Sequence, residues 1–209
     1  MRAALLQLAD GRLPAGGTGH SGGVEQAGLT DVASLTAFLA GRLATAGLVA
    51  AAIAARASQQ VTIMDAEVSA RTPSPAQRAA SRQQGRALLR VARVAWPSPR
   101  YAALGPEPHA AVVLGVAAHA AGLGAADAAW LGAYGSVAGP ASAAVRLLAL
   151  DPVEVAAAVA ALGPAIDEVA RRAAAYADGP VADLPATSAP LLDLLAEHHA
   201  AREDRLFES

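Results

Sequence analysis

The sequence predicts an all-α protein: a single compact multi-helix domain of about eight to ten helices with a C-terminal helical tail. Apolar residues recur at helical spacing along most of the chain, and no stretch shows the alternating pattern of a β-strand. The nearest strand candidate, residues 61–64, is short and runs directly into polar residues. Alanine supplies 59 of the 209 residues. Helices lined by alanine and glycine can approach closely, so thin side chains need not leave voids.

The first long helix is predicted after Asp31, which is a suitable N-cap for a run of apolar residues at helical spacing. Gly47 is expected to interrupt this run before the helix continues over residues 48–56. Asp151 followed by Pro152 is a good start signal, because it places a cap before a proline at the first helical position. The further helices are expected over residues 75–96, 109–122, 125–150, 152–162 and 164–176.

Composition divides the chain into a body and a tail. Residues 1–177 form the predicted helical body, in which four prolines between Trp96 and His109 indicate an exposed loop. Residues 178–190 are rich in proline, alanine and aspartate, which is a linker composition. Residues 191–209 form a last helical segment that we expect to bind a partner.

Three residue types are absent from the sequence: cysteine, lysine and asparagine. Without cysteine there is no disulfide, no thiolate metal site and no cysteine nucleophile. Without lysine there is no Walker A phosphate loop and no Schiff base. The net charge of −2 predicts no general attraction to nucleic acid. The long uncharged run over residues 128–145 is interrupted by glycine, proline and serine, so we expect a cytoplasmic protein without a membrane span.

The segment Gly19-His20-Ser21-Gly22-Gly23 matches the G-x-S-x-G pattern of a hydrolase nucleophile elbow. An elbow holds its serine on a turn between a strand and a helix, and no strand can be drawn through residues 13–18. The alternative is a glycine-rich turn in which Ser21 caps a short helix, with Glu25 one turn later. The later acid and base that a triad needs could be supplied by Asp183 or Asp193 and by His198 or His199.

Five arginines follow one face of the helix expected over residues 75–96. Their spacing confines them to an arc of about 120°. No acidic residue lies between Glu67 and Glu107, so the helix cannot neutralise them locally. Three interpretations remain open: a solvated face, pairing with acidic groups in the fold or in a partner, and nucleic acid, which the pI of about 6.2 disfavours. The five are Arg78, Arg82, Arg86, Arg90 and Arg93.

None of the five histidines forms an H-x-x-x-H or H-x-H pair, so we expect no transition-metal site within one chain. The spacing leaves open a site shared across a symmetric dimer, made by His20 or by the His198-His199 pair. Each histidine is otherwise expected at the surface or at a helix end. The five are His20, His109, His119, His198 and His199.

Segments in the same order along the whole chain resemble the urease accessory protein UreF family. The N-terminal signature is carried by Leu5-Leu6-Gln7-Leu8-Ala9-Asp10, Leu13-Pro14-x-Gly16-Gly17 and His20-Ser21-x-Gly23-Val24-Glu25. The central helices are carried by Ser81-Arg82-x-x-Gly85-Arg86-Ala87-Leu88-Leu89-Arg90, His109-x-Ala111-Val112-Val113-Leu114-Gly115-Val116-Ala117 and Ser142-Ala143-Ala144-Val145-Arg146-Leu147. The closing motif is similar to Arg205-Leu206-Phe207-x-Ser209, with His199 upstream. Thr18 departs from the family, which usually has an aromatic residue there.

The resemblance implies an all-α protein that is not itself an enzyme. Proteins of this family form dimers, bind the accessory protein UreD (also called UreH) and with it recruit the GTPase UreG. The assembly inserts nickel into apo-urease. No cofactor is expected on this chain, since nickel and GTP would be handled by the partners. The residues expected to face partners are Pro14, Gly16, Gly17, His20, Ser21, Gly23, Glu25, Arg82, Arg86, Arg90, His199, Arg205, Leu206 and Phe207.

Overall fold

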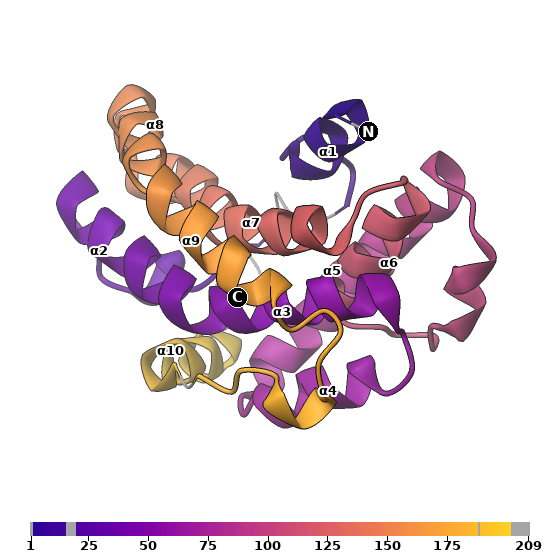
Figure 1. Ribbon diagram of the computed structural model, residues 1–209. Coiled ribbons are helices and arrows are strands. Elements are labelled where there is room, and N and C mark those ends of the chain that lie inside the picture. The colour runs from indigo at the N-terminus through magenta and orange to yellow at the C-terminus, as the bar shows by residue number, and fades with distance from the viewer. Residues whose placement is uncertain (1, 16–19, 188, 202–209) are drawn as a thin grey trace.

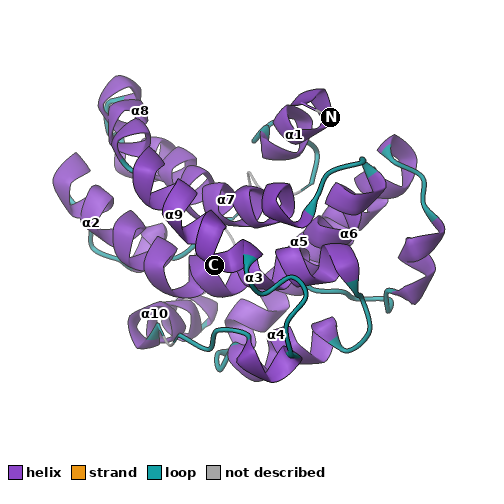
Figure 2. Ribbon diagram, viewed as in Figure 1, coloured by secondary structure: helices purple, strands orange, loops and turns teal. Residues whose placement is uncertain are grey.

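The computed structural model describes residues 2–15, 20–187 and 189–201. Within these residues every regular element is a helix (Figure 2), which confirms the predicted fold class. Short 3-10 segments, η2 (Val24–Gln26), η4 (Pro99–Ala103) and η5 (Val181–Asp183), and a π-helical segment, η3 (Leu43–Gly47), lie between the α-helices. The α-helices are α1 (Arg2–Ala9), α2 (Val32–Arg42), α3 (Leu48–Gln59), α4 (Met64–Arg71), α5 (Pro75–Ala95), α6 (Ala110–Ala120), α7 (Ala125–Leu148), α8 (Pro152–Ala161), α9 (Gly163–Ala174) and α10 (Pro190–Ala200).

Helix α3 occupies the centre of the molecule and packs against α6, α7 and α9 (Figure 1). Most of its side chains are buried, and most of those are alanine. The continuous helical stretch Val32–Gln59, from α2 to α3, is long and apolar enough to cross a membrane by length and composition. Within this stretch, burial of α3 against three other helices accounts for the apolar composition of α3, because a core helix is hydrophobic on all sides.

Small residues let α6 and α7 approach α3 closely, as the alanine-rich composition predicts. A Cβ atom added at Gly132 of α7 would lie 2.8 Å from the Cα atom of Ala51. A Cβ atom at Gly115 of α6 would lie 2.3 Å from the carbonyl oxygen of Ala54. The backbones of α6 and α7 therefore rest directly on the backbone of α3.

The predicted helix starts are confirmed. Asp31 accepts a hydrogen bond from the Ser34 amide (2.7 Å), and Asp151 accepts one from the Val153 amide (2.7 Å). The interruption predicted at Gly47 is not a break, because η3 carries the helix without a turn from α2 into α3. At this point a Cβ atom on Gly47 would lie 2.6 Å from Ser136 Oγ, so glycine serves close packing there.

Two short helices, α1 and α4, are not among the helices expected from the sequence. Helix α4 begins at Met64, the last residue of the strand candidate, and Asp65 and Glu67 in its first turn stabilise the helix N-terminus. Most residues of the proline-rich loop before α6 are exposed, as expected, although η4 within it buries Tyr101.

The segment predicted as a linker packs along the body before it reaches α10. Leu184 is buried in the main core. The Arg71 guanidinium donates to the carbonyl oxygens of Val181 (3.2 Å), Leu184 (3.4 Å) and Pro185 (3.2 Å). The tail helix α10 that follows is held against α5 and η2 rather than projecting from the body.

We expect Gly132→Ala to lower the free energy of unfolding by about 1–3 kcal/mol, because the new methyl group meets backbone atoms of α3. Gly135→Ala, on the same helix with open space around it, is the matched control and should be neutral or stabilising by up to about 1 kcal/mol. Urea unfolding followed by circular dichroism measures both. Equal effects of the two substitutions would contradict the close approach of α7 and α3.

Candidate functional site

Segments far apart in the sequence meet where α10 lies against η2. His199 Nε2 is 3.1 Å from Glu25 Oε2. The His199 side chain is 2% exposed and that of Glu25 is 12% exposed, so this polar contact is almost fully removed from water. Next to it, His198 Nδ1 lies 3.3 Å from Gln26 Oε1 at the surface.

Helix α10 also caps the first turn of α5. Glu197 Oε1 accepts hydrogen bonds from the Ser74 hydroxyl and from the Ala76 amide (2.9 Å). These hydrogen bonds hold the pKa of Glu197 below its usual value. Gln77 Nε2 donates to Asp193 Oδ1 (3.2 Å). We call this contact of α10 with η2 and the first turn of α5 the junction.

The glycine-rich segment turns tightly before the junction. Gly22 and Gly23 have φ angles of 61° and 94°, a region that favours glycine, and a Cβ atom on Gly22 would lie 2.7 Å from Pro140 Cγ. The predicted turn is therefore confirmed. Its cap differs from the prediction: Gly23 is the N-cap of η2, and the Ser21 hydroxyl accepts a hydrogen bond from the Gly23 amide (3.3 Å).

The geometry gives no support to a nucleophile elbow at Ser21. Its side chain is fully buried, and no strand precedes it among the described residues, which exclude 16–19. The two histidines that could have served as a base contact other groups, His198 meeting Gln26 and His199 meeting Glu25.

The arginine face of α5 is partly neutralised inside the fold. Arg82 donates to Asp65 Oδ2 (2.9 Å), and Arg86 donates to Glu107 Oε1 (2.6 Å). Pairing with acidic groups elsewhere in the fold is thus the correct interpretation for these two arginines. Arg90 and Arg93, farther along the helix, are exposed.

The structure brings several of the predicted partner-facing residues together. A groove of about 360 Å³ between α5 and the end of α10 is lined by Arg82, Arg86 and His199, and Glu25 contacts His199. Gly23 packs on the other side of α10, near Leu192, while Pro14 is exposed elsewhere in the N-terminal segment. The predicted residues Gly16, Gly17, Arg205, Leu206 and Phe207 lie outside the described residues.

Sequence reasoning missed a buried histidine network at the start of α6. His109 is fully buried, with Nδ1 3.0 Å from Ser81 Oγ and Nε2 3.0 Å from Ser69 Oγ. Its backbone amide donates to Asp65 Oδ1 (2.8 Å). The network thereby joins α4, α5 and α6. One signal was available, since a histidine directly before an apolar helical run can serve as an N-cap.

Four of the five histidines lie at helix ends, as expected: His109 is the N-cap of α6, His119 is in the last turn of α6, and His198 and His199 are in the last turn of α10. The expectation is wrong for His20, which is buried outside any helix, and the burial of His109 and His199 was not expected. His119 and His198 are exposed. Burial is possible for His109 and His199 because hydroxyl or carboxylate groups from other helices meet the imidazole nitrogens, a tertiary arrangement that spacing cannot reveal.

Burial lowers the pKa of His109 to about 4, and the nearby charge of Arg82 acts in the same direction. Since the folded pKa lies below the ordinary value of 6.5, the unfolded state takes up the proton first as the pH falls. The contribution of neutral His109 to stability is therefore complete above about pH 6.5 and is lost as the pH falls towards about 4.

We expect the free energy of unfolding of the parent protein to fall between pH 6.5 and about 4, by up to roughly 3 kcal/mol from this residue. His109→Asn should be less stable at neutral pH and should show a flatter pH dependence over this range. Urea unfolding at a series of pH values measures the difference between the two proteins. Parallel pH profiles would contradict a buried neutral His109.

Within the described parts of the chain, no three histidine, cysteine, aspartate or glutamate side chains lie close enough together to hold a metal ion. The fold and the junction define a helical scaffold in which η2, the start of α5 and α10 form one surface.

Comparison with known proteins identifies the kind of scaffold. The family model of UreF matches residues 29–163. The urease accessory protein UreF of Mycolicibacterium vanbaalenii is 50% identical, over 99% of this chain and 98% of that protein. Those of Mycobacterium marinum and Mycobacterium tuberculosis are 49% and 46% identical, each over 99% of this chain and 98% of the relative.

The scaffold is thus a urease accessory protein, with a role in urease maturation. The chain belongs to the UreF family.

Proposed function

We propose that this chain is a cytoplasmic adaptor that binds UreD and, together with it, recruits the GTPase UreG for nickel insertion into apo-urease. In this proposal the chain acts as a homodimer, as the resemblance to the family implies. Nickel is the cargo of the assembly, and GTP is bound by UreG. The adaptor works by making different contacts with different states of its partners.

The observation that carries the proposal is the two-sided character of α10. One side is fixed to the body by the Glu25–His199 contact and by Glu197. The other side exposes two large apolar residues, Leu191 (61% exposed) and Leu194 (69% exposed). Neighbouring exposed apolar side chains on a firmly held helix are typical of a protein-binding surface.

The amino-acid composition supports the assignment of nucleotide and metal binding to the partners. A chain without lysine has no Walker A lysine to place against nucleotide phosphates, which favours a GTPase partner. A chain without cysteine lacks the soft thiolate ligands of many metal carriers. The alternative of an arginine face that binds acidic partners is weaker, because Arg82 and Arg86 already pair within the fold.

We expect the double variant Leu191→Ser, Leu194→Ser to weaken capture of UreD by about tenfold or more, because two exposed apolar anchors are removed. Removing the residues after Pro190 should abolish capture. Val153→Ser changes a similarly exposed side chain (74%) on α8 and is the matched control, expected to leave the affinity within about twofold. The measurement is co-purification with UreD, followed by titration of the purified pair.

The serine variants should keep the helical content of the parent protein, since both leucines are exposed. Capture of UreD at full affinity by the folded double variant would show that α10 is not the docking surface.

A further inference from the structure

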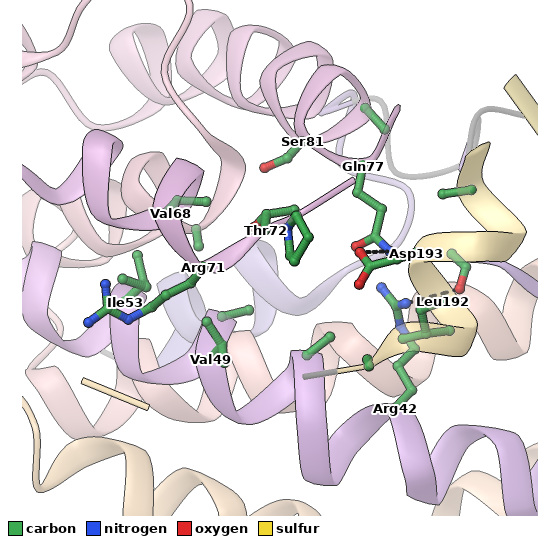
Figure 3. A pocket seen from close by; sticks show the side chains of 18 of the residues that line it. Arg42, Val49, Ile53, Val68, Arg71, Thr72, Gln77, Ser81, Leu192 and Asp193 are labelled. Atoms are coloured by element: carbon green, nitrogen blue, oxygen red, sulfur yellow. Dashed lines mark hydrogen bonds between the residues drawn. The ribbon is translucent and has the colours of Figure 1, made fainter. Parts of the chain in front are cut away.

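A cavity of about 330 Å³ lies beside α10 and next to the groove with Arg82 and Arg86 (Figure 3). Ala196 of α10 lines both. The cavity is partly open, and it is lined by residues of α2, α3, α4, α5 and α10, by the glycine-rich segment with His20, and by the segment that leads into α10. Its volume is in the range of sites that hold small ligands.

Most of the cavity wall is aliphatic. Val49 and Ile53 of α3, Val68 of α4 and Leu192 of α10 line it together with several alanines. No aromatic side chain is among the described residues that line it. This part of the cavity is suited to a short branched alkyl group.

One end of the cavity carries two opposite charges. Arg42 donates to the carbonyl oxygens of Gly22 (3.0 Å) and Ser136 (3.1 Å), and burial lowers its pKa to about 10. The described part of the chain places no carboxylate within 4.0 Å of this guanidinium. Asp193 lines the same end and accepts a hydrogen bond from Gln77. Arg42 and Asp193 therefore face one space without forming an ion pair.

We infer that this cavity binds a small aliphatic α-amino acid in its zwitterionic form. The carboxylate of the ligand meets Arg42, the ammonium group meets Asp193, and the alkyl side chain lies against Val49, Ile53 and Val68. The carboxylate of a simple carboxylic acid would be attracted by Arg42 but repelled by Asp193. The ammonium group of a simple amine would be attracted by Asp193 but repelled by Arg42. Only a molecule that carries both charges complements both groups.

A bound amino acid would also affect α10, although the inference does not rest on the proposed partners. Arg42 is the last residue of α2, whereas Asp193 is in the first turn of α10. A ligand that bridges these two residues binds only while α10 is docked, and it therefore stabilises docking by mass action. Hydrogen exchange of the α10 amides should become slower when the ligand is present.

The test is titration of the full chain, by calorimetry and by NMR, with three probes of similar size. L-leucine carries both charges, isocaproate lacks the amine, and isoamylamine lacks the carboxylate. We expect saturable binding of L-leucine with a dissociation constant of about a millimolar or tighter, and binding of the other two at least about tenfold weaker. L-leucine should also slow exchange in α10.

Two variants show which residues are responsible. Asp193→Asn should weaken the binding of L-leucine by about tenfold, because the charge that meets the ammonium group is lost. The same substitution should strengthen the binding of isocaproate, because repulsion of its carboxylate is removed. Ala50→Leu fills the cavity and should abolish binding of every probe while the protein stays folded. Binding of isocaproate as tight as that of L-leucine to the parent protein, or no saturable binding of L-leucine up to about 50 mM, would overturn the inference.

Discussion

The contact between Glu25 and His199 holds the C-terminal helix α10 against η2. Two polar side chains that are almost fully removed from water are stable only while each has a partner. Separation of α10 from η2 would remove this contact from both side chains. The tight turn at Gly22 and Gly23 brings Glu25 to this position, and Glu197 fixes the same helix to the start of α5. The junction is therefore a single unit, although its parts lie far apart in the sequence.

Helical periodicity and local start signals were sufficient to predict the fold class and most helices. Asp31 and Asp151 each accept a hydrogen bond from a backbone amide two or three residues later in the chain, so their capping roles can be predicted from the sequence. The short helix α4 was missed because its stability comes largely from packing rather than from its own pattern. The segment around Leu184 has a linker composition, yet carbonyl groups in it meet Arg71, more than a hundred residues away.

The candidate site was predictable only in part. Glu25 and His199 stand in segments that resemble family motifs, but nothing in their spacing showed that they contact each other. Arg82 pairs with Asp65 across two helices, which the absence of acidic residues on its own helix could not reveal. Buried polar contacts of this kind depend on tertiary placement. Alanine and glycine make that placement possible, because they allow the helix backbones to lie close enough for short side chains to meet.

The most direct test of the junction as a docking surface is hydrogen exchange of the chain alone and in complex with UreD. We expect residues 20–27 and α10 to gain protection together on binding, since they form one unit. Exchange at α8, on the far side of the molecule from α10 in Figure 1, should stay unchanged. Protection that appears at α8 while both junction segments exchange as in the free chain would contradict the assignment.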